Sequence, residues 1–326
     1  MIRIIDKDGL AQAFIDEWLS SSTTVKAHTS GSTGVPKEVY LEKKDMRLSA
    51  LTTCRHFNID SSSVLHLPLS TDYIAGKMMV VRAFVSGATL VVERPSRNPL
   101  AELPAGIECV DLTAVVPSQV EGLLSSPNLP KVRSVIVGGG VLSSEIESRL
   151  RKMPLDAWST YGMTETCSHV ALRHLQSPTM AYAALPGIHL SVDSRGCLVI
   201  DAPDYTFGRI ITNDMVRMLS DNEFQWLGRY DNVINSGGIK LHPEEMEKRL
   251  EGAVTCRFYI VGRPSEQWGE EAVIVVENAT DMQCDRIMQR AREVFERHSV
   301  PKAVINTPRF IYASNGKIKR VLPVDI

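Results

Sequence analysis

The apolar residues of the chain follow two spacings in turn. Leu10, Phe14 and Trp18 stand every fourth position, which predicts an amphipathic helix over 10–19 that starts near Lys7 or Asp8. Farther along, short apolar runs alternate with helically spaced segments as far as residue 161. This alternation is typical of an α/β layer with parallel strands. The predicted strands are 64–69, 88–92, 109–112, 132–137 and 156–161, and the predicted helices are 43–57, 75–86, 143–152 and one after Pro117.

The pattern changes after Pro186. Short apolar runs with turn-forming residues between them predict a small, barrel-like antiparallel β region at 188–192, 197–201, 208–212, 216–219 and 224–227. From about Asn232, helices at 243–250 and 281–297 mix with strands at 258–261, 272–277 and 303–306. We therefore predict an α/β fold with two domains. Residues 1–230 form a large domain of layered sheets and helices that includes the antiparallel region, and residues 231–326 form a small α+β domain.

Composition narrows the class of protein. The chain has 326 residues, of which 44% are hydrophobic, and a net charge of −2, so it is long enough for a sizeable core and gives no electrostatic reason to expect nucleic acid. Its six cysteines are scattered, without a C-x-x-C pair, as in reduced proteins. The charged N-terminus does not look like a signal peptide, and no apolar run reaches membrane-spanning length. We expect a cytoplasmic protein that binds neither membranes nor nucleic acid.

The most informative stretch is TSGSTGVPK, from Thr29 to Lys37. Gly31 and Gly34 let main-chain N–H groups approach an anion, and the hydroxyl and ammonium groups around them can donate to it. These donors belong to Thr29, Ser30, Ser32, Thr33 and Lys37. A flexible Ser/Gly linker is the plain alternative, but a linker needs neither a lysine nor strand-like flanks. The stretch does not fit the Walker A pattern, because Pro36 stands where the second glycine belongs.

A second motif, YGMTET, begins at Tyr161, at the end of a predicted strand, where α/β sheets bind their ligands. Tyr161 offers a flat face to a base, Thr164 a hydroxyl to a phosphate, and Glu165 a carboxylate to Mg²⁺. A strand that ends in a polar turn explains the hexapeptide equally well. Upstream, Gly138, Gly139 and Gly140 end another apolar strand, where a permissive turn is an equally simple explanation.

Two further motifs lie toward the C-terminus. Asp214, in TNDMV, and Arg229, at the start of GRYDNVINSGGIKLHPEEME, could together hold the hydroxyls of a ribose, because a carboxylate accepts two hydrogen bonds and a guanidinium donates in a fixed fork. Lys317 lies in NGKIKR near the chain end, where a lysine is usually just solvated. His66, His169 and His242 show no partner in the sequence and are predicted to be structural or solvated.

Taken together, these ordered motifs resemble the adenylate-forming superfamily of acyl-CoA synthetases, luciferases and peptide-synthetase adenylation domains. The resemblance implies an enzyme that uses ATP, Mg²⁺ and coenzyme A on a small-molecule carboxylic acid, with a mobile C-terminal domain that swivels at Asp231. It implies that residues 138–140 line the adenine and acyl pockets and that Lys317 reaches the substrate carboxylate and the α-phosphate during adenylation. It also implies that Gly237, Gly238 and Lys240 lie near the thiol path.

Some segments depart from the family pattern. Family members carry a long segment before the phosphate loop, whereas this loop begins at Thr29, so either the acyl pocket is more open or another subunit of a homo-oligomer covers it. In LPLSTDYIAGK, Tyr73 replaces a common histidine and could line the acyl pocket, although an ordinary core tyrosine explains it as well.

Within the superfamily, the sequences around Tyr161 and Gly237 are most similar to those of o-succinylbenzoate-CoA ligases. An enzyme for another aromatic acid, one that loads a carrier-protein thiol, and a non-catalytic adenylate-binding protein remain as alternatives.

Overall fold

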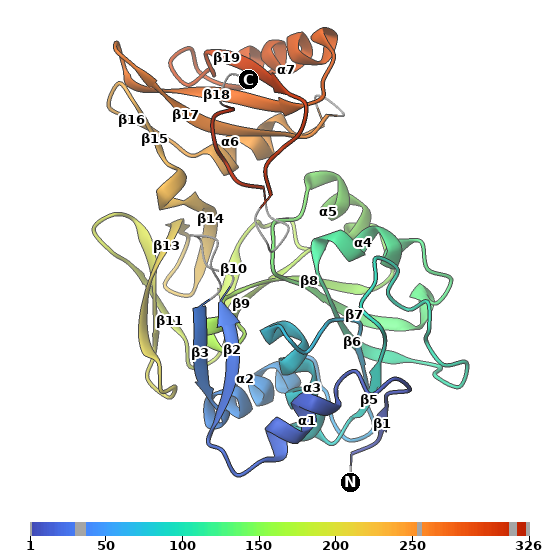
Figure 1. Cartoon of the computed structure of the whole chain (residues 1–326). Helices are drawn as coiled ribbons and strands as arrows, with labels where there is room; N and C mark the ends of the chain where they lie inside the picture. Colours follow the sequence, from blue (N-terminus) through green and yellow to red (C-terminus); the bar gives the residue numbers. More distant parts are fainter. Residues whose placement is uncertain (1, 30–36, 253–255, 313–317, 324–326) are drawn as a thin grey trace.

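The computed structural model describes residues 2–29, 37–252, 256–312 and 318–323 (Figure 1). Within these ranges, a twelve-stranded sheet runs in the order β1-β5-β4-β6-β7-β8-β9-β10-β14-β13-β12-β11. Its first six strands are parallel to one another, as the alternation of strands and helices predicted. They are β1 (Ile4–Ile5), β4 (Val64–Leu67), β5 (Thr89–Val92), β6 (Val110–Val115), β7 (Val132–Val137) and β8 (Asp156–Gly162).

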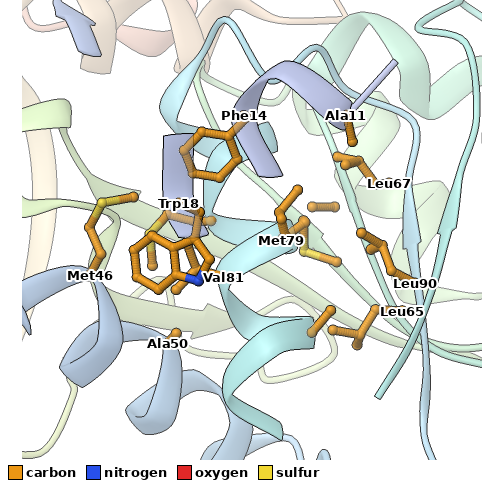
Figure 2. Close-up of a cluster of buried hydrophobic side chains, with 14 of the residues drawn as sticks. Ala11, Phe14, Trp18, Met46, Ala50, Leu65, Leu67, Met79, Val81 and Leu90 are labelled. Carbon is orange, nitrogen blue, oxygen red and sulfur yellow. The ribbon is translucent and has the colours of Figure 1, made fainter. Parts of the chain in front are cut away.

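Helices cover both faces of the parallel half. They are α1 (Gln12–Leu19), α2 (Lys43–His56), α3 (Ile74–Ser86), α4 (Pro117–Leu124) and α5 (Ser144–Arg151). Side chains of α1, α2 and α3 pack with one face of the strands, including Phe14, Met46 and Met79, as Figure 2 shows. On β7, Ile136 joins this cluster, while its neighbours Val135 and Val137 face a second cluster under α4 and α5. The alternation of side chains along each strand therefore builds the layers.

The turn before α1 is held by Asp6. The carboxylate of Asp6 accepts hydrogen bonds from the backbone N–H groups of Leu10 and Ala11, at 3.0 and 2.8 Å, the two residues that precede the first helical residue, Gln12. Asp8 instead forms an ion pair with Arg94.

The antiparallel strands continue the same sheet. They are β9 (His169–His174), β10 (Tyr182–Ala184), β11 (His189–Val192), β12 (Cys197–Ala202), β13 (Gly208–Met218) and β14 (Glu223–Arg229). The predicted antiparallel β region is confirmed, but it begins before Pro186, because β9 already pairs antiparallel with β8 and links the two halves of the sheet. The polar stretch that seemed to separate two strands lies inside β13, where Thr212 and Asp214 are buried and hydrogen-bonded.

A second sheet of five strands lies toward the C-terminus, in the order β16-β15-β18-β17, with β19 beside β18. Its elements are β15 (Ile234–Ser236), β16 (Ile239–Leu241), α6 (Pro243–Leu250), β17 (Phe258–Ser265), β18 (Gly269–Glu277), α7 (Asp281–Val294) and β19 (Ala303–Thr307). The sequence pattern missed the short β15 and β16. The chain enters this part through the 3-10 turn Tyr230–Asn232, and a domain division at Tyr230–Asp231 stays a prediction.

A separate hairpin joins β2 (Thr24–Thr29) to β3 (Lys37–Glu42), as predicted, with Thr29 opposite Lys37. All six cysteines are free thiols. In the described ranges, no helix combines the length and the apolar character needed to cross a membrane.

Candidate functional site

The first feature of the site is where two parallel strands end. Because β7 and β8 run in parallel, the glycines that follow Val137 and the turn that follows Gly162 lie at one edge of the sheet. Gly138 donates its N–H to the carbonyl of Val115 at 3.1 Å. A β-carbon on Gly138 would lie only 2.4 Å from Thr160 Oγ1, so the approach of the loop to β8 requires glycine there.

A buried carboxylate lies nearby and collects three side-chain donors. Asp214 accepts hydrogen bonds from Tyr161 Oη at 2.8 Å, from Trp226 Nε1 at 3.2 Å and from Arg229 Nη1 at 3.4 Å. Asp214 and Arg229 also stand opposite each other in the β13–β14 ladder. The structure thus brings together three residues predicted from separate motifs. Trp226 was not predicted, because a lone tryptophan in a strand gives no sign of where its N–H points.

Electrostatics keep Tyr161 as a donor. Burial, and then the neighbouring Asp214 carboxylate, raise the pKa of the Tyr161 phenol well above its ordinary value. Its ring is held by Phe224, with ring centroids 5.0 Å apart, and by Tyr182, at 6.0 Å. Ser159 in turn pairs with the Tyr182 hydroxyl at 2.7 Å. The phenol is therefore fixed in place and protonated at neutral pH.

The turn after β8 lies against the β2–β3 hairpin. Thr164, the first residue of the 3-10 turn Thr164–Thr166, has its Oγ1 3.5 Å from the carbonyl oxygen of His28, one residue before Thr29. Lys37 begins the opposite strand with an exposed side chain. The other loop candidates, Ser30, Gly31, Ser32, Thr33 and Gly34, lie outside the described residues, as does Lys317. The described part of the chain nevertheless places both ends of that loop near Thr164.

The predicted magnesium ligand fits a metal that arrives with phosphates. Among the described residues, no group of three or more His, Cys, Asp or Glu side chains could hold a metal ion alone. Glu165 is exposed, and its carboxylate makes no hydrogen bond or ion pair with another described residue. Mg²⁺ is usually held by one or two carboxylates together with substrate phosphates and water, which one free carboxylate at a strand end suits.

An arginine supports the same turn from beneath, and the sequence analysis missed it. Arg82, on α3, is fully buried and donates from Nη2 to Ser168 Oγ at 2.8 Å. No described carboxylate pairs with it, and burial lowers its pKa to about 10. His169 lies beside it, hydrogen-bonded to Thr53 at 3.1 Å, and burial lowers the pKa of His169 well below its ordinary value. Both side chains are structural supports of the Tyr161–Ser168 segment.

The histidines agree with their predicted structural role. His66 is buried between Thr113 and Glu93, with 2.9 Å to each. His242 precedes α6, and its Nδ1 is buried without a partner among the described residues.

The C-terminal candidates lie apart from this cluster. Gly237 and Gly238 form the two-residue turn between β15 and β16, and both have positive φ, 58° and 85°, as a type I′ hairpin requires. Lys240 is exposed on β16. Figure 1 places β15 and β16 in the upper part of the molecule, well apart from β8. Within the described ranges, no hydrogen bond or ion pair joins residues 234–241 to the large sheet.

The two remaining candidates are Asp231, at the predicted domain junction, and Tyr73, predicted for the acyl pocket. Asp231 lies 3.3 Å from Arg229 and 3.3 Å from Asn213, so it shares partners with the buried carboxylate cluster. Tyr73 precedes α3, and 62% of its surface is exposed. It follows the end of β4, at the same edge of the sheet as Gly138, and its role stays a prediction.

Comparison with known proteins gives consistent results. The sequence model of a family described as AMP-binding enzyme matches residues 16–203. A solved acyl-CoA synthetase (AMP-forming)/AMP-acid ligase II-like protein from Dyadobacter fermentans is 31% identical, with a TM-score of 0.65, over 97% of this chain and 93% of that one. The o-succinylbenzoate CoA synthetase of Bacillus subtilis, solved with its acyl-adenylate intermediate, has a TM-score of 0.78 at 20% identity, over 90% of this chain and 67% of that one. The second likeness bears on the fold alone, and it confirms the predicted α/β architecture.

Two curated proteins give the range of relatives. The 2-succinylbenzoate–CoA ligase of Salmonella typhimurium is 24% identical over 94% of this chain and 69% of its own length. A linear gramicidin synthase polypeptide of Brevibacillus parabrevis is 27% identical over 98% of this chain, which spans 5% of that protein. Ligases and peptide synthetases are therefore both among the proteins similar to this chain.

Proposed function

The chain belongs to the AMP-binding enzyme family, and from this premise we propose that it is an ATP-dependent acid-CoA ligase that works through an acyl adenylate. The carrying observation is that Tyr161, Asp214 and Arg229, from separate motifs, meet in one hydrogen-bonded cluster at the edge of the sheet. A structural role alone would not need these groups beside the strand ends where α/β sheets bind ligands.

In the proposed first half-reaction, a substrate carboxylate oxygen attacks the α-phosphorus of ATP. The new C–O–P bond forms as the bond from the α-phosphorus to the bridging oxygen breaks, and pyrophosphate leaves with that electron pair. Asp214 accepts three side-chain hydrogen bonds and so keeps about one of its lone-pair sites for a ribose hydroxyl, and Arg229 would donate to the same sugar. Mg²⁺ carried by ATP and Glu165 would neutralise phosphate oxygens and ease the departure of pyrophosphate.

Residues 29–37 and Lys317 have proposed roles on the phosphates. The hydroxyl and N–H groups of the loop would hold the β- and γ-phosphates, and Thr164 would donate to a phosphate beside them. Lys317 would neutralise the charge that grows at the α-phosphate. Removing a preorganised group of this kind often raises the activation free energy by about 3–4 kcal/mol.

In the proposed second half-reaction, the coenzyme A thiol loses its proton and the sulfur attacks the acyl carbon, which releases AMP. We propose that the C-terminal domain, residues 231–326, swivels at Asp231 and brings Gly237, Gly238 and Lys240 toward the thiol path. Their separation from the large sheet in the described orientation supports a movement between the two steps.

We propose o-succinylbenzoate as the acid, in menaquinone synthesis. The proposal is supported by the sequence of the motif around Tyr161 and by the similarity to the Salmonella ligase. The peptide-synthetase relative keeps a carrier-protein thiol as the second candidate for the acceptor.

The test is pyrophosphate release with ATP, Mg²⁺ and o-succinylbenzoate, with and without coenzyme A. Release that requires this acid and ends in a CoA thioester is the expected result. Release with other aromatic acids only would keep the chemistry and replace the substrate. ATP binding without release for any acid would overturn the ligase proposal in favour of a non-catalytic adenylate-binding protein.

A further inference from the structure

One hydrogen bond joins the ends of two helices from different parts of the molecule. The backbone N–H of Ser144, the first residue of α5, donates to a carboxylate oxygen of Glu251 at 2.6 Å. Glu251 directly follows the last residue of α6. The contact therefore links the C-terminal part to a helix of the large sheet, across 107 positions of sequence.

The contact is favourable for electrostatic reasons. The first N–H groups of a helix have no partner inside the helix, and the helix dipole makes that end partly positive. In α5, the side chain of Ser143 accepts from Ile146 N at 3.3 Å, which leaves the Ser144 N–H for an outside acceptor. Glu251 supplies a full negative charge, and the carbonyl end of α6 beside it adds a partial one.

The contact is also close to the proposed chemistry. Only residues 141–143 separate α5 from Gly138–Gly140, and Leu142 anchors this link in the core. Glu244, on α6, accepts a hydrogen bond from Asn232, next to the predicted swivel. The bond between Ser144 and Glu251 therefore ties α6, and with it the C-terminal part, to a helix that begins just after the strand-end glycines.

We propose that Glu251 is a positioning residue: its bond to Ser144 stabilises the orientation of the C-terminal part in which the acyl adenylate forms. This inference rests on the proposed function. The described orientation keeps Gly237 and Gly238 off the large sheet, so it does not match thiol transfer. Breaking the bond thus favours the other orientation and slows the first half-reaction selectively.

The first test is Glu251→Ala. Because a hydrogen bond to a charged group is lost, adenylate formation should slow roughly tenfold, while thioester formation from a supplied acyl adenylate is retained. Glu251→Gln keeps an acceptor and should recover part of the rate. Lys317→Ala, expected to lose adenylation and keep transfer, gives the reference phenotype. Asp285→Ala is the charge control, because Asp285 is exposed on α7 and makes no hydrogen bond within the described chain.

The second test removes the donor. Ser144→Pro deletes the N–H at the first helical position, where proline is well tolerated, and Ser143 already has the extended φ and ψ (−68°, 152°) that a residue before proline favours. The variant should copy Glu251→Ala, and the double variant should be no slower than either single one.

Amide hydrogen exchange at Ser144 checks the contact without any activity. Exchange roughly tenfold faster in Glu251→Ala, and unchanged in Asp285→Ala, is expected from the same hydrogen-bond energy. Unchanged exchange would show that the contact is absent in solution, and equal slowing of both half-reactions, or multiplying effects in the double variant, would overturn the positioning role. If the wild-type chain forms no adenylate with any acid, the proposed function fails and the positioning role with it, while the exchange result still decides whether the contact exists.

Discussion

The candidate residues of the large sheet and those of the C-terminal sheet are held in opposite ways. Asp214 is buried and receives Tyr161, Trp226 and Arg229. Lys240 and the turn at Gly237 are exposed and make no hydrogen bond or ion pair with the large sheet within the described ranges. One set is organised before any ligand arrives, and in the proposed mechanism the other is brought to the ligand.

This difference separates the groups that the fold positions before a ligand binds from those that it does not. Groups that hold the ribose of a nucleotide gain from preorganisation, since no reorganisation is needed at the moment of binding. Groups that serve only the second step would obstruct the first if they stayed in place. Changes in the first set should therefore weaken nucleotide binding, and changes in the second should leave it intact.

The largest effect should come from Asp214→Ala. Removing the carboxylate leaves the Tyr161 hydroxyl and the Trp226 N–H without their acceptor and Arg229 with Asp231 alone, which should cost on the order of 3 kcal/mol of unfolding free energy. ATP affinity should fall roughly a hundredfold, because a hydrogen bond between the ribose and a charged group is lost, and such a bond is worth up to about 3 kcal/mol. Urea unfolding and ATP titration calorimetry measure the two quantities.

Asp201→Ala is the matched control for that variant. Asp201 lies on β12, is more exposed than Asp214 and is 3.5 Å from Arg209. An exposed ion pair contributes about 0–1 kcal/mol, so stability and ATP affinity should change little. Equal losses in the two variants would remove Asp214 from the nucleotide site.

Tyr161→Phe should have an intermediate effect that depends on pH. The variant should bind ATP about tenfold more weakly, because Asp214 loses one of its three side-chain donors. The pKa of Tyr161 is raised on folding, so the folded state keeps a proton that the unfolded state releases above about pH 10. The stability that the phenol adds is therefore complete below pH 10 and is lost above it, by about 1.4 kcal/mol per pH unit.

Urea unfolding of the wild type and of Tyr161→Phe between pH 8 and 11 measures this loss. The gap between the two proteins should be constant up to about pH 10 and close above it. Tyr40→Phe, at an exposed tyrosine, controls for general alkaline effects. A gap that stays open at pH 11 would contradict the raised pKa.

Much of the fold could be predicted from the sequence, because its signals are local. The spacing of apolar residues gave β7 and α6 at their observed bounds. It failed where partners distant in sequence decide the outcome. The stretch from Asn213 to Met215 looked like a break between two strands, since the bonds that hold it within β13 reach β8 from Asp214 and β12 from the neighbouring Thr212. The twelve-strand continuity likewise depends on β9, whose residues are almost all buried and therefore show no apolar–polar alternation.

The site residues likewise fall into two groups, those that a sequence motif could identify and those that it could not. Tyr161, Asp214 and Arg229 could be selected because each stands in a motif that resembles a known family. Trp226 and Arg82 could not, because their importance comes only from what their side chains reach, Asp214 in one case and Ser168 in the other. Glu251 is a stronger example, because its partner is a backbone N–H, which no sequence pattern displays.

The smallest predicted effect concerns the Gly237–Gly238 turn of the C-terminal sheet. Gly237→Ala and Gly238→Ala both place a side chain at positive φ, which costs about 1 kcal/mol each. Only at Gly237 would the new β-carbon meet an obstacle, the Trp268 ring at 2.6 Å, whereas nothing lies within 4 Å of it at Gly238. Gly237→Ala should therefore lower the unfolding free energy by about 1 kcal/mol more, as the ring has to shift. ATP affinity should equal that of the wild type in both variants, and a loss there would show that the turn already takes part in nucleotide binding and that the two regions are not organised differently.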